Sequence, residues 1–119
     1  MSETSEILRT VLERLTWAQN QHKLWFVRVN SGKVFLSYTR KKNGVTKGRC
    51  IKLAPTGTPD VFVFQRATKH TSRVTAIETK TQDGELSEVQ QEVKALLEEQ
   101  GVTHLTVRDA AQLDALGLD

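Results

Sequence analysis

Apolar residues at the start of the chain follow the spacing of a helix. They recur every three or four positions, at Ile7, Leu8, Val11, Leu12, Leu15 and Ala18. This pattern predicts an amphipathic helix over 5–19, and Thr4 or Ser5 can cap its first turn. A second helix is predicted over 88–100, where one face carries Val89, Val93, Leu96 and Leu97. Gly101 is the residue type that commonly ends a helix.

Short runs rich in β-branched and aromatic residues predict strands between these helices. The runs cover 24–29, 33–38, a segment through 50–53, 60–65, 74–80 and 102–107. Asn30-Ser31-Gly32 has the composition of a tight turn, which would return 33–38 against 24–29 as a hairpin. The polar segment 66–73 predicts another turn, so the strands on either side of it should be antiparallel neighbours.

The end of the chain predicts one more short helix. It would start at Asp109 and turn Leu113 and Leu116 inward. The full order is helix, several strands, helix, strand and helix. This order indicates an α/β fold in which helices flank a mixed sheet. The length of 119 residues fits a single domain over 1–119.

Composition excludes several classes of protein. Hydrophobic residues make up 38% of the chain and charged residues 26%, values typical of a soluble globular domain. No apolar run approaches the roughly 18 residues of a membrane span, and the start of the chain does not resemble a signal peptide. Cys50 is the only cysteine, which excludes a disulfide framework and favours a reducing compartment such as the cytoplasm. The three histidines are too far apart for a zinc motif.

Charge is distributed unevenly along the chain. Residues 1–80 hold 15 Lys or Arg and 5 Asp or Glu, a balance of +10, whereas residues 81–119 hold 2 and 9, a balance of −7. No acidic residue occurs between Arg14 and Pro59. A field of one sign attracts polyanions, and nucleic acid is the natural candidate. A solvated basic hairpin without a partner is the alternative.

The candidate chemistry lies on two neighbouring strands. Asp60 opens one predicted strand, and Glu78 and Lys80 close the next. In an antiparallel pair the start of one strand lies beside the end of the other, about 4.8 Å away. Both carboxylates could therefore reach one hard cation. By strand alternation Glu78 and Lys80 share a face, while the Thr79 side chain points away and only its carbonyl stays near.

Two carboxylates and a carbonyl form an all-oxygen site suited to Mg²⁺ or Mn²⁺. Such an ion lowers the pKa of bound water and neutralises charge on a phosphate. A lysine beside it can stabilise negative charge that develops during the reaction. Phosphodiester hydrolysis requires these parts. The alternative is a surface Glu and Lys at an ordinary strand end.

Four segments of the sequence together resemble a known family. The segments that carry the likeness are Arg28-Val29-Asn30-Ser31-Gly32, Gly57-Thr58-Pro59-Asp60, Ile77-Glu78-Thr79-Lys80 and Gly84-Glu85-Leu86-Ser87 followed by Gln90. Together they resemble the virus-type replication-repair nuclease domain (VRR-NUC), which belongs to the PD-(D/E)xK nuclease superfamily. The resemblance covers roughly residues 5 to 108. A chain of this length resembles the stand-alone phage and bacterial members, which implies a bacterial or phage-infected cell.

The resemblance implies a role for each matching residue. Asp60 and Glu78 would bind the metal through their carboxylates, and Thr79 through its main-chain oxygen. Lys80 would be the catalytic lysine. Gln90 would face the site from the following helix.

Two points stay open. Ser87 and Gln90 also have the spacing of a capping box, so Gln90 could simply close the start of its helix. The family places a glutamate of the first helix near the metal, and Glu3, Glu6 and Glu13 are all candidates.

The resulting hypothesis is a metal-dependent DNA endonuclease that cuts branched DNA such as Holliday junctions. A homodimer is implied, because a resolvase cuts two symmetric strands. The basic region 23–53 would hold the phosphate backbone, and its expected DNA-binding residues are Arg28, Arg40, Lys41, Lys42, Lys47 and Arg49. The alternatives are a restriction-like or nicking nuclease on linear DNA, and a nucleic-acid-binding module without catalysis. Trp17, Trp25 and Phe26 could stack on bases, but core packing is the preferred interpretation for the two in the strand.

Overall fold

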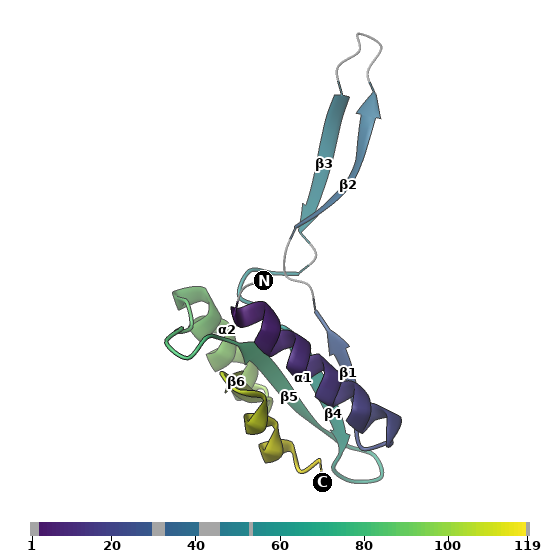
Figure 1. Ribbon diagram of the computed structural model, residues 1–119, viewed down its shortest axis with the longest axis vertical. Helices are drawn as coiled ribbons and strands as arrows, with labels where there is room; N and C mark the ends of the chain where they lie inside the picture. The colour runs from purple at the N-terminus through teal and green to yellow at the C-terminus, as the bar shows by residue number, and fades with distance from the viewer. Residues whose placement is uncertain (1–2, 30–32, 41–45, 53, 119) are drawn as a thin grey trace.

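The computed structural model describes residues 3–29, 33–40, 46–52 and 54–118. Figure 1 shows their arrangement, in which a long hairpin extends from a body of helices and a sheet. The elements in chain order are α1 (Glu3–Asn20), β1 (Trp25–Arg28), β2 (Lys33–Arg40), β3 (Thr46–Lys52), β4 (Val61–Arg66), β5 (Ser72–Thr79), α2 (Glu88–Glu99), β6 (Thr103–Val107) and the 3₁₀ helix η1 (Ala110–Leu116). Each predicted helix and strand is present. Most of their bounds lie within two residues of those predicted, and β3 starts earlier than the segment expected for it.

The main sheet has four strands in the order β1-β4-β5-β6. The β1/β4 and β4/β5 pairs are antiparallel, whereas β5 and β6 are parallel and are joined by α2. This confirms the expected mixed sheet flanked by helices. Among the described helices, none is long and apolar enough to cross a membrane.

The predicted hairpin between 24–29 and 33–38 is wrong. β1 pairs with β4, and β2 pairs instead with β3 in a separate two-stranded sheet. Turn composition favours a local pairing, but it carries no information about burial. Against β4, β1 packs Phe26 on the hydrophobic core, a gain that a pairing in the projecting hairpin would not provide.

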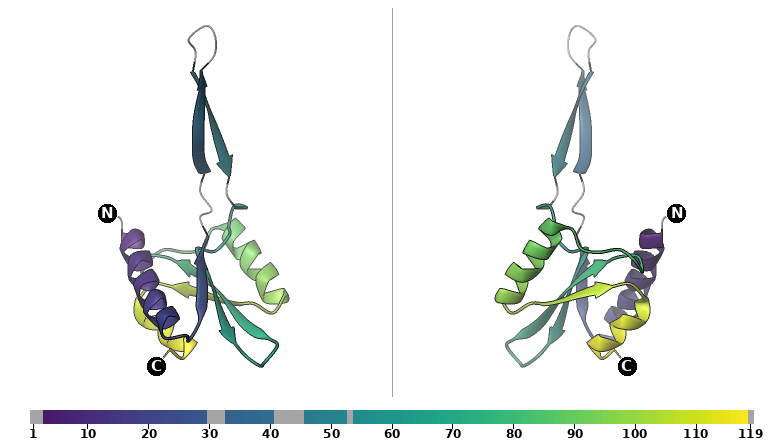
Figure 2. Two further views of the ribbon diagram at one scale, coloured as in Figure 1. Left: turned by 90° about the vertical axis from the view of Figure 1, so that its right-hand side faces the viewer. Right: turned by 90° about the vertical axis from the view of Figure 1, so that its left-hand side faces the viewer.

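Helices cover the two faces of the sheet unequally. α1 and η1 lie on one face and α2 lies on the other, as Figure 2 shows. The hydrophobic core lies between the sheet and the helices α1 and η1. It is built from Val11, Leu15, Ala18, Leu24, Val61, Val63, Ile77, Val107, Leu113, Leu116 and Leu118. The core therefore fixes the positions of β4 and β5, the two strands that carry the candidate site.

The aromatic residues of β1 only partly meet the expectation of core packing. Phe26 packs against the core, but Trp25 is 57% exposed. Trp25 lies on the face opposite α1, and α2 packs there against β6, at the far edge of the sheet. Core packing is therefore wrong for Trp25.

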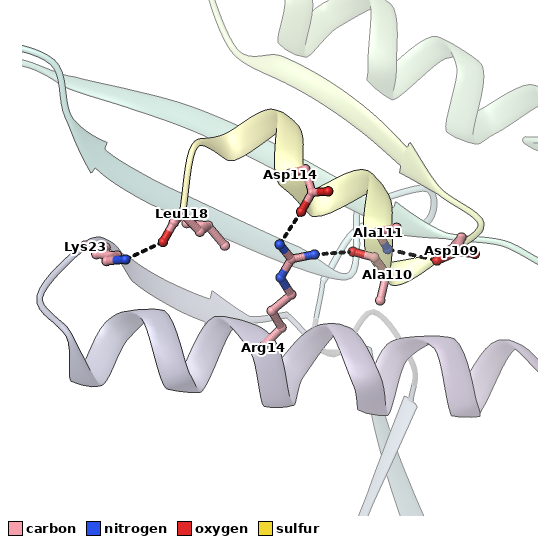
Figure 3. A network of polar contacts seen from close by, with 7 residues as sticks. All are labelled: Arg14, Lys23, Asp109, Ala110, Ala111, Asp114 and Leu118. Atoms are coloured by element: carbon pink, nitrogen blue, oxygen red, sulfur yellow. Dashed lines mark hydrogen bonds and ion pairs between the residues drawn. The ribbon is translucent and has the colours of Figure 1, made fainter.

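The last helix is fastened to the first by polar contacts, which Figure 3 shows from close by. Arg14 of α1 donates to the Ala110 carbonyl at 2.9 Å and forms an ion pair with Asp114. The amine of Lys23 donates to the Leu118 carbonyl. Asp109 caps η1 through the main-chain N–H of Ala111, and Leu113 and Leu116 are buried as predicted.

We expect Arg14→Ala to lower the free energy of unfolding by about 1–2 kcal/mol, because it leaves the Ala110 carbonyl and the Asp114 carboxylate without their shared donor. Arg9→Ala is the matched control. Its partner Glu13 lies one turn along the same exposed helix face, and such pairs contribute about 0.3–0.5 kcal/mol. Urea unfolding of both variants measures the difference, and equal losses would contradict the role given to Arg14.

Candidate metal centre

Asp60 and Glu78 lie directly opposite each other at one end of the sheet. The register pairs Val61 with Ile77, so the residues one step further are these two acids. The main-chain N–H of Asp60 donates to the Ile77 carbonyl at 2.9 Å, which extends the pairing to Asp60. The structure therefore brings together the two carboxylates that the sequence placed on neighbouring strands.

The Asp60 carboxylate is held in place by Thr79. Its Oδ2 atom accepts hydrogen bonds from the main-chain N–H and from the hydroxyl of Thr79, both at 2.8 Å. The Asp60 carbonyl accepts a further bond from Val29 at 2.7 Å. The prediction that the Thr79 side chain points away is thus wrong. Thr79 is the last residue of β5, and Asp60 precedes the first residue of β4. The alternation of side chains that holds within a strand therefore does not keep these two side chains on opposite faces.

The Glu78 carboxylate is buried and only half satisfied. Glu78 is 4% exposed, and its Oε1 accepts a hydrogen bond from the Gln90 side chain at 3.1 Å. Its Oε2 is buried and has no hydrogen-bond partner in the described part of the chain. Burial, the main cause, and the negative charge of Asp60, the second, together raise the pKa of Glu78 to about 8.

Gln90 fills both of the roles left open by the sequence. Its side chain accepts from the main-chain N–H of Ser87 while its own N–H donates to the Ser87 hydroxyl, which completes the capping box. The amide nitrogen of the same side chain donates to Glu78. The start of α2 is therefore tied directly to the candidate site.

Lys80 follows the end of β5, where its main-chain N–H donates to the Val107 carbonyl at 2.9 Å. The positive charge of its amine lowers the pKa of Glu78 against the larger raising effects. The charge of Lys80 therefore acts on Glu78. It has no ion-pair partner among residues 54–118.

The donor set fits a hard divalent cation. Two facing carboxyl groups, one with a buried oxygen that has no partner among the described residues, provide oxygen ligands that a divalent cation could bind in place of the Glu78 proton. Asp60 and Glu78 could hold Mg²⁺ or Mn²⁺, and the Thr79 carbonyl lies on the same strand end. Within the described residues, however, no three His, Cys, Asp or Glu side chains gather at one point.

The structure does not place a third glutamate at the site. Glu13 is paired with Arg9 at 2.8 Å on the exposed face of α1. Glu6 lines a shallow surface pocket together with Thr10 and Arg108. Glu3 is the first residue of α1.

The expected DNA-binding residues lie in several places. Arg28 is exposed on β1, where it lines a surface pocket of about 500 Å³ against α1. Arg40 lies on β2, and Lys47 and Arg49 lie on β3. Lys41 and Lys42 lie outside the described residues.

The packing of Gly57 was not evident from the sequence. Its φ angle is +89°, and a Cβ at this position would lie 2.7 Å from Val89 Cγ1 and 3.0 Å from both the Val89 carbonyl oxygen and Val93 Cγ2. The loop before Asp60 thus lies directly on α2, the helix that carries Gln90. The Gly-x-Pro-Asp pattern was the available signal, but its spacing does not reveal the helix that it touches.

Comparisons with known proteins give no family assignment. No protein-family model matches the chain, and no match was found among curated proteins or solved structures. The interpretation of the site therefore depends on the geometry of its own residues.

We expect Glu78→Gln to remove a pH dependence of stability. Between about pH 4.5 and 8 the folded state holds a proton on Glu78 that the unfolded state has released. The free energy of unfolding therefore falls as pH rises through this window. The melting temperature of the native protein should be roughly 5–10 °C lower at pH 9 than at pH 6. The corresponding difference should be much smaller in the variant.

The Glu78→Gln variant also tests whether the centre binds a metal ion. At pH 9, Mg²⁺ or Mn²⁺ should raise the melting temperature of the native protein by linkage and leave Glu78→Gln nearly unchanged. Identical pH and metal responses in the two proteins would contradict the proposed centre.

We also expect Gly57→Ala to lower the free energy of unfolding more than Gly101→Ala, by about 1–3 kcal/mol. The two glycines have nearly the same positive φ, +89° and +88°, so the backbone strain is matched. Apart from its chain neighbours, no described residue has an atom within 4 Å of the Cβ position of Gly101. Chemical denaturation of the pair isolates the contact with Val89, and equal losses would show that this contact is unimportant.

Proposed function

We propose that this protein is a metal-dependent DNA endonuclease with a PD-(D/E)xK type of site that hydrolyses phosphodiester bonds in branched DNA. One observation carries the proposal: two carboxylates converge at the ends of adjacent strands, one of them has a buried oxygen without a hydrogen-bond partner among the described residues, and the charge of Lys80 acts on that carboxylate.

Each residue has a defined task under this proposal. Asp60 and Glu78 hold Mg²⁺ or Mn²⁺, with the Thr79 carbonyl as a further oxygen ligand. Bound there, the ion would activate water and neutralise charge on the phosphate. The Thr79 N–H and hydroxyl fix the orientation of Asp60, and Gln90 fixes that of Glu78. The Lys80 amine orients the attacking water and stabilises the negative charge that develops on the phosphate.

Charge supports DNA as the substrate. The ten basic residues between Arg14 and Pro59 include those of the hairpin formed by β2 and β3. The two ends of this hairpin connect to the site, because Val29 lies between β1 and β2 and donates to Asp60, and residues 54–59 lead from β3 to Asp60. Phosphate contacts along the hairpin would therefore direct the bound strand toward the carboxylates. A homodimer acting on four-way junctions remains part of the proposal.

One observation favours a second candidate. No third acidic ligand joins Asp60 and Glu78 among the described residues, as would suit a nucleic-acid-binding module that has lost catalysis. The two candidates differ in a single measurable property, which is cleavage.

We expect Asp60→Asn to reduce cleavage at least about 10³-fold while binding survives, because an asparagine oxygen can still accept from Thr79. Lys80→Met should reduce kcat by about 10²–10³-fold with little change in affinity. Asp83→Asn, an exposed acid in the nearby loop, is the control and should retain full activity.

The assay uses labelled four-way junction, flap, nicked and linear duplex DNA, each with Mg²⁺, Mn²⁺ or chelator. Cleavage that is metal-dependent and lost in Asp60→Asn supports the nuclease. Tight binding with no cleavage of any substrate would favour the module without catalysis. Cleavage that persists in Asp60→Asn would refute the site.

A further inference from the structure

One half of the sheet has an uncovered aromatic face beside the carboxylates. Of the described helices, α2 packs against β6, and none packs on β1 and β4 on the face opposite α1. The apolar residues on this open half are Trp25, Val27, Phe62 and Phe64, which we call the aromatic platform. Trp25 is 57% and Val27 38% exposed, and the two phenylalanines are half-buried.

Pairing and ring contact show that these residues share one face. Trp25 lies opposite Phe64, and their ring centres are 5.8 Å apart at an angle of 48°. Val27 lies opposite Phe62 in the next row. Phe26, between Trp25 and Val27, points the other way and packs on the core.

The platform is continuous with the candidate metal centre. Along β4, Phe62 lies two positions and Phe64 four positions from Asp60. At the usual rise of a strand these are about 7 and 14 Å. A short extended stretch of polymer could therefore reach the carboxylates and lie across the rings at the same time.

The far end of the platform is basic. The segment 66–73 contains no acidic residue. Gln65 points toward η1, where its side chain donates to the Leu116 carbonyl, so the exposed Arg66 projects to the same side as Phe64. Lys69 is exposed in the adjacent turn. The platform thus has carboxylates at one end, aromatic rings in the middle and cations at the other end.

We propose that the aromatic platform binds unpaired nucleotides of a DNA strand, whose bases stack on Trp25 and its neighbours while the strand runs between the cations and the metal centre. This inference rests on the proposed function, and it specifies the substrate as DNA with unpaired nucleotides beside the scissile phosphate. Stacking on exposed aromatic rings within a basic surface is how proteins bind single strands without reading sequence.

The structure argues against a second copy of the chain adding a strand at this edge. The outer edge of β1 is partly closed, because the main-chain N–H of Phe26 donates to the Gln19 side chain at 3.1 Å. Two protomers meeting through this face would also bring Arg66 and Lys69 of each into a shared interface. A polyanion is better matched to these cations than a second basic copy.

The two tryptophans provide a matched pair for the test. Trp17 is 54% exposed, nearly as much as Trp25, but it lies on α1 and the amine of Lys23 sits 5.0 Å from its ring centre. The chain has only these two tryptophans. Trp17→Phe therefore leaves Trp25 as the only indole, and its fluorescence should be quenched when oligothymidylate binds.

The decisive measurement is the affinity for labelled oligothymidylate and for a duplex of equal length, with chelator present and in the Asp60→Asn background. We expect Trp25→Ala to weaken single-strand binding about 5- to 50-fold and duplex binding less than twofold, because duplex bases are already stacked on one another. Trp25→Phe should restore most of the affinity. Trp17→Ala should change neither.

Each contrary result has a clear meaning. An equal loss for single strand and duplex, or no loss, would overturn the platform. So would a concentration-dependent dimer that Trp25→Ala dissociates while leaving DNA affinity unchanged, since this result would assign the face to a second copy. Trp25-dependent binding without cleavage by the native protein would refute the nuclease and leave the platform standing. Cleavage by the native protein, with no effect of Trp25→Ala on DNA binding, would support the nuclease and overturn the platform.

Discussion

The structure depends on the unfavourable proximity of two acids. Glu78 is buried opposite Asp60, and its second carboxylate oxygen has no hydrogen-bond partner among the described residues. Burying such a group costs free energy, and the rest of the fold must hold it there. Thr79 binds Asp60, and Gln90 binds Glu78. A fold without use for this arrangement would gain stability by replacing either acid, so the arrangement itself is the strongest pointer to function.

The elements of the fold were predictable because they are local. The apolar spacing between Ile7 and Ala18 is sufficient for α1, and the antiparallel pairing of β4 and β5 follows from the short polar turn between them. The pairing of β1 was not predictable, since Asn30-Ser31-Gly32 favours a local hairpin and the burial of Phe26 against distant residues decides the outcome.

The candidate site was predictable to a similar extent. Asp60, Glu78 and Lys80 could be placed together from strand order alone. The hydroxyl of Thr79 was missed because alternation does not hold at a strand end, and the exposure of Trp25 was missed because it depends on which strands α2 covers. Both features arise from contacts between distant segments, which periodicity along the chain does not record.

The fastening of η1 to α1 bears on the order in which the protein can mature. Leu113, Leu116 and Leu118 complete a core whose other half comes from α1 and the sheet. During synthesis the strands that bear the acids emerge well before these three leucines. The apolar inner face of α1 therefore stays partly exposed until η1 leaves the ribosome. Chaperones that shield such surfaces would act in that interval, and the acids would be held rigidly in place only after it.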